Sequence, residues 1–304
     1  MDVIEVEHLN KRYRDHVAVQ DVSFAVHRGE IFGVLGPNGA GKTTTVECVT
    51  GMRVPDGGSV RVFGLDPHRD HDQLRTRIGV QFQESQLPEK MRVKEALQLY
   101  SSFYADPADW RRLLDDWGLQ DKATTSFGKL SGGQKQRLFI ALALVGNPDI
   151  AVLDELTTGL DPQARRDTWG LVEDIRAKGV TVLLVTHFMA EAERLCDRIA
   201  VIDNGRVVAL DTPAGLVSSV AAEQRIRFRP SVPVPDGLLT DLPEVTSVRQ
   251  AGPHLEIAGT GDLLQAVTSV LARHRIVAAD LRIEQASLDD AFVALTGRKL
   301  EETR

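Results

Sequence analysis

A glycine-rich loop that follows a short apolar run constrains this chain more than any other feature of its sequence. The apolar run is Ile31–Leu35, and the residues after it are Gly36, Pro37, Asn38, Gly39, Ala40, Gly41, Lys42, Thr43 and Thr44. This order matches G-x-x-x-x-G-K-[ST], the loop between a strand and a helix whose backbone N–H groups surround phosphate. Glycine allows the tight turn, Lys42 can neutralise phosphate charge, and the Thr43 hydroxyl is a hard ligand for Mg²⁺. The loop therefore predicts an α/β fold with a nucleotide site, to which we also assign Thr44.

Two adjacent carboxylates follow a second apolar run. Residues 150–153 are Ile, Ala, Val and Leu, and Asp154 and Glu155 come next. Taken alone, such a pair is often only the polar end of a buried strand. After a phosphate-binding loop, the same pair favours phosphoryl transfer, in which Asp154 holds Mg²⁺ and Glu155 polarises the attacking water.

The segment Ser131, Gly132, Gly133 and Gln134 combines a structural signal with a binding signal. Ser131 and Gln134 have the S-x-x-Q spacing of a capping box, and an apolar-rich helix to Val145 follows. A capped helix start with flexible glycines also offers N–H groups and a positive dipole end to an anion. Both interpretations hold together.

In this order, the motifs resemble those of the ATPase of an ATP-binding-cassette (ABC) transporter, over about residues 1–218. By this resemblance the phosphate loop is the Walker A motif, residues 150–154 followed by Glu155 are the Walker B motif, and Leu130 with Ser131 to Gln134 is the signature. The resemblance assigns further roles. Gly159, Leu160 and Asp161 form the D-loop, and Gln83 is the Q-loop glutamine, with Gln81 as the weaker choice. His187 is the switch histidine, and Tyr13 stacks on adenine. It implies that Glu155, His187 and Gln83 are catalytic, and that Thr43, Gln83 and Asp154 bind Mg²⁺.

The resemblance also implies an architecture and partners. The expected fold is a P-loop NTPase cassette with a parallel-sheet core, an antiparallel β-layer and a helical subdomain. The expected activity is that of a Mg²⁺-dependent ATPase. Two copies would bind ATP head to tail, with Ser131 to Gln134 of one copy closing the site of the other, and a separate multi-span membrane permease would be driven. One departure is Leu156, where the family usually has proline, and we expect it to alter rate or rigidity without abolishing activity.

Composition excludes several other classes of protein. Hydrophobic residues make up 42% of the chain, yet the longest apolar stretches, such as 138–145 and 180–185, are too short to cross a bilayer. The N-terminus has no secretion signal, so we expect a cytoplasmic protein, attached to the membrane face only through its permease. The net charge of −7 argues against a broad nucleic-acid surface. Cys48 and Cys196 are expected to be small buried hydrophobes.

Periodicity predicts the remaining elements of the cassette. Runs at 4–6, 22–26 and 59–62 indicate the antiparallel layer, and 93–119 is mainly helical, with apolar positions that include Leu97, Tyr100 and Phe103. A helix at Pro162–Ala177 lies between the apolar runs 150–153 and 180–185, which predicts two buried parallel strands. Residues 199–203 and 206–210 indicate a hairpin with Asn204-Gly205 at its turn.

Residues 219–304 are predicted to form a small α+β domain for assembly or regulation. Strands are expected near 224–228, 247–249, 255–257 and 279–284, with helices at 262–273 and 288–295. The segment from Ser287 to Gly297 resembles the C-terminal extension of drug-export ATPases of the daunorubicin-resistance type, although a capped amphipathic helix would look the same. On this basis we expect export of a drug-like or lipid-like compound. The alternatives are a soluble ABC ATPase acting on ribosomes or DNA, which usually has tandem cassettes or coiled-coil arms, and an importer ATPase with a regulatory tail.

Overall fold

The computed structural model describes residues 1–82, 85–220, 224–284 and 287–298 and divides into two compact units. The first unit is Met1–Pro213, and the second begins at Ala214. Ser218, where the sequence placed the boundary, lies inside helix α8 (Pro213–Val220). Within the described residues, none of the helices combines the length and the apolar character that a membrane span requires.

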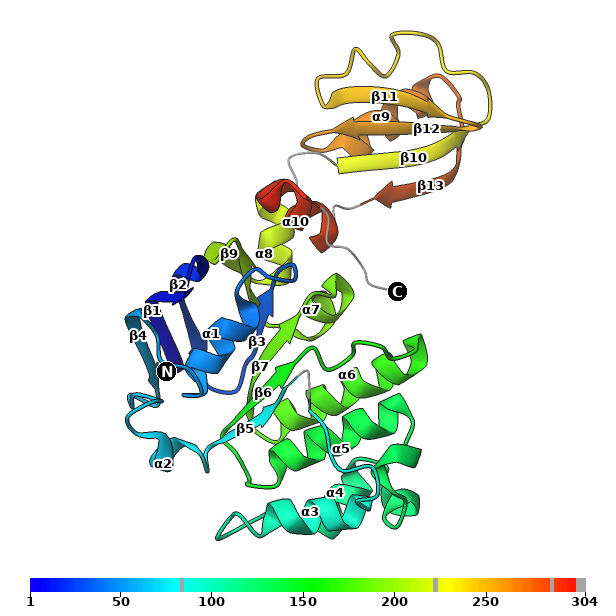
Figure 1. Ribbon diagram of the computed structural model, residues 1–304. Coiled ribbons are helices and arrows are strands. Elements are labelled where there is room, and N and C mark those ends of the chain that lie inside the picture. The colour runs from blue at the N-terminus through cyan, green and yellow to red at the C-terminus, as the bar shows by residue number, and fades with distance from the viewer. Residues whose placement is uncertain (83–84, 221–223, 285–286, 299–304) are drawn as a thin grey trace. The chain divides into compact units, whose positions relative to one another are not determined.

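The first unit is built on a nine-stranded sheet with the order β4-β1-β2-β9-β8-β3-β7-β6-β5 (Figure 1). Its core consists of parallel strands, namely β3 (Ile31–Leu35), β5 (Ile78–Gln81), β6 (Ile150–Asp154), β7 (Thr181–Thr186) and β8 (Arg198–Asp203). Strands β3, β6 and β7 are buried along their whole length, because both faces of a parallel sheet are covered. The parallel core and both predicted buried strands are therefore confirmed.

An antiparallel layer extends this sheet on one side. It contains β1 (Asp2–Tyr13), β2 (His16–His27) and β4 (Gly57–Val62), while β9 (Arg206–Asp211) pairs antiparallel with β8. Strands β1 and β2 are much longer than the predicted runs at 4–6 and 22–26. Several register shifts interrupt the pairing of β1 with β2, and they break the strict alternation from which strands are predicted. The β8–β9 hairpin turns at Asn204 and Gly205, whose φ angles are both positive, as predicted.

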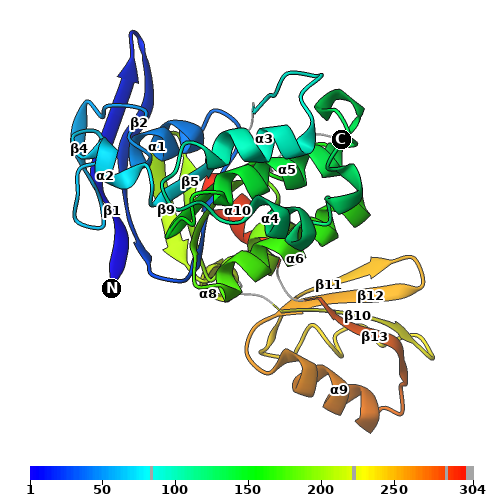
Figure 2. The same ribbon diagram turned by 90° about the horizontal axis from the view of Figure 1, so that it is seen from below.

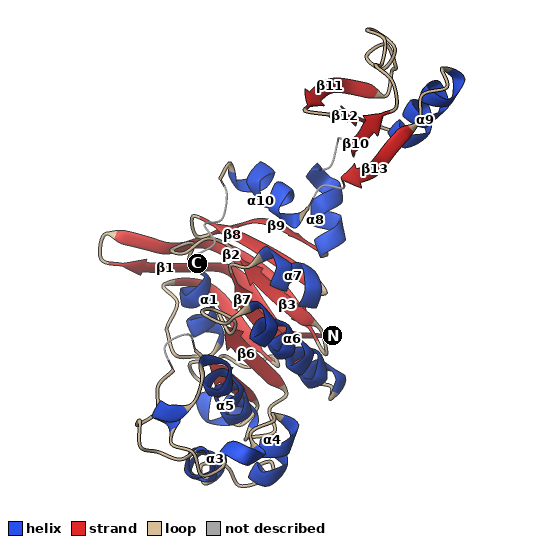
Figure 3. Ribbon diagram, turned by 90° about the vertical axis from the view of Figure 1, so that its right-hand side faces the viewer, coloured by secondary structure: helices blue, strands red, loops and turns tan. Residues whose placement is uncertain are grey.

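Helices pack on this sheet and beyond its β5 edge. They are α1 (Lys42–Val49), α2 (His71–Leu74), α3 (Val93–Ser101), α4 (Trp110–Asp116), α5 (Gly132–Leu144), α6 (Pro162–Ala177) and α7 (Met189–Leu195), with short 3₁₀ turns at Gln120–Lys122 and Phe127–Lys129. Helices α3, α4 and α5 gather beside β5 and β6, forming the predicted helical subdomain (Figure 3). Phe103, one of the apolar positions in the stretch predicted to be helical, lies beyond the end of α3 at Ser101 and is 67% exposed.

The second unit is a four-stranded antiparallel sheet covered by one helix. The strand order is β11 (Val245–Ala251), β12 (His254–Gly259), β10 (Gln224–Pro230) and β13 (Ala278–Glu284). Helix α9 (Leu263–Arg273) lies across one face of it (Figure 2), and its Leu263, Val267 and Leu271 share a core with Ile226 and Phe228. This unit also contains α8 and α10 (Leu288–Thr296). The strands and helices predicted for the small α+β domain are confirmed.

Candidate functional site

The phosphate loop connects β3 to α1 and requires glycine at Gly41. The φ angle of Gly41 is +99°, and a Cβ atom there would lie 2.3 Å from the carbonyl oxygen of Ala18. Lys42 folds back over the loop, where its Nζ donates to the carbonyl oxygens of Gly36, at 2.7 Å, and Pro37, at 3.1 Å. Burial lowers the pKa of Lys42, although Glu155 and Asp154 oppose this shift. The loop thus holds a nearly buried cation beside two carboxylates.

Asp154 ends strand β6 with a fully buried carboxylate. Its Oδ2 accepts a hydrogen bond from the Thr43 hydroxyl at 3.5 Å, and its Oδ1 has no hydrogen-bond partner among the described residues. Burial, followed by the charge of Glu155, raises the pKa of Asp154 to about 6. A buried carboxylate with an unused oxygen next to a hydroxyl is a donor set that suits Mg²⁺, which prefers hard oxygen ligands. The residues present therefore fit the expected metal.

Glu155 has an unusual backbone conformation and a specific partner. Its φ angle is +50°, a left-handed value that costs energy in a residue other than glycine and is often found at functional sites. Its Oε1 is hydrogen-bonded to Nδ1 of His187 at 3.1 Å and lies 4.0 Å from Nζ of Lys42. The hydrogen bond from His187 is the main cause that lowers the pKa of Glu155. Nε2 of His187 is buried and has no partner in the described part of the chain.

A cavity of about 340 Å³ lies over the phosphate loop. It is lined by Tyr13, His16, Ala18, Asn38, Gly39, Gly41, Lys42, Thr43, Thr44 and Glu155. Gly36, Pro37 and Ala40 belong to the loop but do not line this cavity. Asp154 and His187 are joined to it by their hydrogen bonds to Thr43 and Glu155. Most of the residues predicted to contact nucleotide and metal are thus brought together by the fold.

His16 is a residue of this cavity that the sequence analysis missed. It pairs directly with Tyr13 across the turn between β1 and β2. The only sequence signal was the short polar loop of Arg14 and Asp15, which places the residues on either side of it next to each other. Tyr13 itself is half-buried, with the guanidinium of Arg53 5.1 Å from the centre of its ring.

A second, separate cavity of about 270 Å³ contains the signature segment. Its lining residues are Ser131, Gly132, Gly133, Gln134, Arg137, Gly159, Leu160, Asp161 and Ala164. The predicted capping box is confirmed, since the Ser131 hydroxyl accepts from the Gln134 N–H at 3.3 Å and Gln134 Oε1 accepts from the Ser131 N–H at 3.0 Å. None of these residues lines the cavity over the phosphate loop.

Two further residues that the sequence analysis assigned to the site, Asp161 and the Q-loop glutamine, are considered separately. Asp161 caps helix α6, because its Oδ1 accepts hydrogen bonds from the N–H groups of Gln163 and Ala164, and these bonds lower its pKa. Gln83 lies outside the described residues. The alternative Gln81 is 3% exposed and lines neither of the two cavities; its Nε2 donates to the carbonyl oxygen of Phe82.

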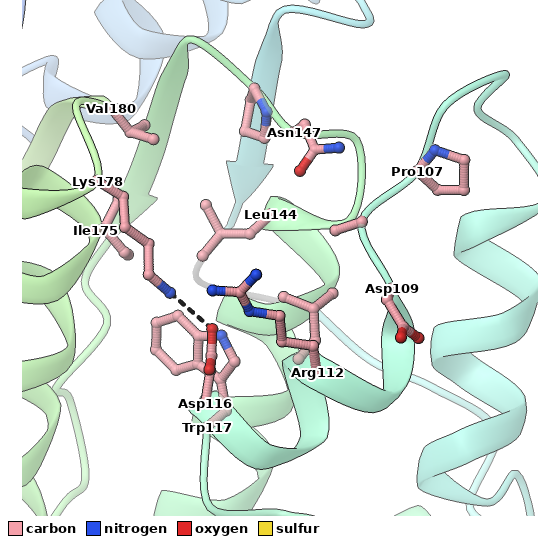
Figure 4. Close-up of a pocket in the computed structure, with 13 residues that line it drawn as sticks. Pro107, Asp109, Arg112, Asp116, Trp117, Leu144, Asn147, Ile175, Lys178 and Val180 are labelled. Atoms are coloured by element: carbon pink, nitrogen blue, oxygen red, sulfur yellow. Dashed lines mark hydrogen bonds and ion pairs between the residues drawn. The ribbon is translucent and has the colours of Figure 1, made fainter.

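A larger cavity, of about 550 Å³, lies between α4 and the ends of α5 and α6 (Figure 4). Its mouth carries an ion pair between Lys178 and Asp116 at 2.7 Å, beside the buried ring of Trp117. Pro148 and Val180, which line it, stand just before strands β6 and β7. It is therefore at the opposite ends of these strands from Asp154 and His187. Because nucleotides bind at the carboxyl ends of parallel strands, we do not place the nucleotide here.

Comparison with known proteins gives consistent results for this chain. Residues 19–158 match the ABC transporter family. A Nod factor export ATP-binding protein I from Ralstonia nicotianae is 37% identical over 99% of this chain and 95% of its own length, and one from Burkholderia orbicola is 38% identical over 98% of each. Among solved structures, an ABC transporter ATP-binding cassette in its ADP conformation is 26% identical, with a TM-score of 0.63 over 70% of this chain and 91% of its own. A dimeric cassette in a post-hydrolysis state, bound to ADP and phosphate, is 26% identical, with a TM-score of 0.63 over 69% of this chain and 98% of its own.

Proposed function

The chain belongs to the ATP-binding subunits of ABC transporters, and from this premise we propose that two copies bind ATP between them, hydrolyse it and power export through a separate membrane permease. The observation that carries this proposal is the separation of the two cavities. The cavity over the phosphate loop contains Lys42, Thr43 and Glu155, whereas the signature residues Ser131 and Gln134 line another. A second copy placed head to tail with twofold symmetry would bring one cavity of each kind together at two ATP sites.

Within one such site, the charged residues have distinct tasks. Glu155 accepts a proton from the water that attacks the γ-phosphate, and ADP leaves as the bond to the γ-phosphorus breaks. The hydrogen bond from His187 keeps the Glu155 carboxylate ionised and oriented, while Nε2 of His187 stays available as a further donor or acceptor. Lys42 neutralises charge on the phosphates. Mg²⁺, when held by Thr43 and Asp154, supplies further neutralisation of phosphate charge, and Gln83 is the third proposed ligand.

Asp154 is the last residue of β6, and Glu155 follows it with a left-handed φ angle, so the two neighbouring carboxylates face different partners. Asp154 contacts Thr43, and Glu155 contacts His187. We therefore expect Glu155→Gln to keep ATP binding, to lose turnover by about 10³-fold, and to accumulate an ATP-bound dimer. Steady-state ATPase assays and size-exclusion chromatography with ATP measure these effects. Glu193→Gln, which changes an exposed carboxylate on α7, is the matched control, and near-normal hydrolysis by Glu155→Gln would contradict the proposal.

The proposed direction of transport rests on the names of the relatives, and the proposed location rests on the expected permease. The two relatives described above are named as export proteins. The resemblance of residues 287–297 to daunorubicin-type export ATPases rests on the sequence alone, and on it we base the proposal of a drug-like or lipid-like compound. The chain would then work at the cytoplasmic face of the membrane, held there by its permease. Leu156 is fully buried directly after the catalytic carboxylates, so that packing takes the place of the usual proline in holding this segment.

The second unit, which begins at Ala214, is proposed to serve assembly and regulation, because the phosphate-directed residues precede it. A chain that ends after Thr212, just before α8, should bind Mg-ATP within about twofold of the full chain but copurify less well with its permease. Isothermal titration and pull-down yield measure the two effects. Loss of ATP binding in a folded, truncated chain would place the second unit inside the nucleotide site.

A further inference from the structure

The open face of the four-stranded sheet in the second unit carries a cluster of arginines. Along β10, Ile226 and Phe228 are buried under α9, so the residues that alternate with them project from the opposite face. These residues are Arg225, Arg227 and Arg229. Figure 2 shows that α9 covers only the other face of this sheet.

Strand register adds two more arginines to the same face. Arg249 on β11 lies opposite Glu256 on β12. On the next strand, Arg227 lies opposite both Glu256 and Arg282 on β13. This row crosses the whole sheet and contains three guanidinium groups and one carboxylate. Neighbouring strands are about 4.8 Å apart, so the charges are crowded.

Most of these arginines have no partner in the described part of the chain. Arg229 pairs with Asp280 at 3.2 Å, but Arg225, Arg227, Arg249 and Arg282 form no ion pair there, and Nε of Arg227 is buried without a hydrogen-bond acceptor. Like charges directly opposite each other destabilise a sheet, as Arg227 and Arg282 do here. Side chains that oppose stability in this way are expected at functional sites.

A polar hollow of about 220 Å³ lies within this cluster. It is lined by Arg225 on β10, Ser247 and Arg249 on β11, and Glu256 on β12. Ala258, opposite both Ser247 and Arg225, is the small residue that leaves room between the two arginines. The two rows that cross the sheet at the hollow contain Arg225, Arg227, Arg249 and Arg282, together with Glu256 and Glu284, which the register places opposite Arg225. Four guanidinium groups against two carboxylates leave two positive charges, so the balance suits a ligand with two negative charges.

We propose that this hollow binds the dianionic phosphate of a phosphomonoester. Arginine is the residue best matched to phosphate, because its planar fork donates two parallel hydrogen bonds, and no lysine lies between residues 214 and 298. Arg225 and Arg249 hold the phosphate and Ser247 donates to it, while Glu256 accepts from a hydroxyl or amine elsewhere on the ligand. The aromatic residues between 214 and 298, Phe228 and Phe292, are both buried. The face therefore lacks the stacking surface that single-stranded nucleic acid requires.

The test uses the full chain with Mg-ADP at saturation, so that the phosphate loop is already filled. Glycerol 3-phosphate, followed by calorimetry, represents a free ligand, and phosphatidylcholine vesicles with phosphatidic acid, followed by flotation, represent a lipid headgroup. The double variant Arg225→Gln with Arg249→Gln should bind at least about tenfold more weakly than the unaltered chain, since two charge-assisted contacts are lost. Arg273→Gln, at the exposed end of α9, is the matched control and should bind within about twofold of it.

Each outcome decides the proposal, which does not depend on ATP hydrolysis. Binding of glycerol 3-phosphate, of the vesicles, or of both supports it when the double variant is impaired and Arg273→Gln is not, and the pattern identifies the source of the phosphate. Absence of binding to both probes at millimolar concentration overturns it, as does equal binding by the double variant. Binding of an acidic peptide without either phosphate probe also overturns it and would identify this face as a protein-docking surface. Circular dichroism of the double variant verifies that it is folded.

Discussion

The cavity over the phosphate loop and the cavity around the signature differ in how they treat charge. Lys42 and Glu155 line the first cavity, and Asp154 and His187 are hydrogen-bonded to residues that line it. The side chains of all four are almost completely removed from solvent, and burial lowers the pKa of Lys42 and raises that of Asp154. In the second, Ser131 is exposed and the main features are a capped helix start and glycines. The first cavity is therefore equipped for chemistry, and the second offers N–H groups directed at an anion.

This difference indicates how the work of the site is divided. Keeping buried ionised groups next to each other costs free energy, which is recovered only through partners such as His187 for Glu155. The signature segment carries no such cost, because its hydroxyl and amide groups satisfy each other in the capping box. A polar segment of this kind can remain exposed in the single chain and contribute to a site only when a second copy arrives.

Substitution at Ser131 should separate ATP turnover, which needs the signature, from ATP binding by the isolated chain, which does not. Ser131→Arg places a long side chain at the signature and should reduce ATP turnover by about 10²-fold while leaving ATP affinity of the isolated chain unchanged, since the first cavity is intact. The loss of the cap also costs about 1 kcal/mol in the free energy of unfolding. Steady-state turnover, ATP titration and urea unfolding measure these quantities. Ser131→Thr keeps a capping hydroxyl and should retain most activity; an equal loss of ATP affinity in Ser131→Arg would show that the signature binds its own chain's nucleotide.

The buried charges of the first cavity predict a pH dependence that the second cavity lacks. Mg²⁺ binds the ionised form of Asp154, whose pKa is raised to about 6 by burial and by Glu155. Above this pH the carboxylate is ionised, and below it protons compete with the metal. The Mg²⁺ concentration for half-maximal ATP binding should therefore rise by up to about tenfold per pH unit below pH 6.

This dependence is measured by Mg²⁺ titration with a fluorescent ATP analogue between pH 5 and 7.5. The binding of Mg²⁺ to the free analogue, measured at the same pH values, provides the correction for protonation of the phosphates. A corrected Mg²⁺ requirement that stays constant down to pH 5 would show that Asp154 has an ordinary pKa in the functional state.

Local signals in the sequence were sufficient for much of the fold. Helix α6 has the predicted ends, and its start agrees with local signals, because Asp161 caps it and Pro162 suits the first turn. The hairpin at Asn204 and Gly205 was predicted because its turn requires positive φ angles. Long-range information was missing elsewhere: β1 and β2 continue through register shifts, and Phe103 follows the last turn of its helix.

The site shows the same limit. The phosphate loop and the two carboxylates were identifiable from residue types, whereas His16 joins them only through its pairing with Tyr13. The alternating arginines of β10 are visible in the sequence, but the positions of Arg249 and Arg282 on the same face depend on strand register.

The central claim is that each ATP site combines the phosphate loop of one copy with the signature of another, and mixed dimers test it most directly. Copies carrying Ser131→Arg and copies carrying Lys42→Ala are inactive alone by this account, since every site in each parent dimer has one defect. In a mixed dimer one site contains both defects and the other contains none. An equimolar mixture should then recover up to about a quarter of the unaltered turnover, because random pairing makes half of the dimers mixed and each has one intact site of two. Affinity capture through two different tags verifies that mixed dimers have formed. The account would be contradicted if verified mixed dimers were as inactive as both parents.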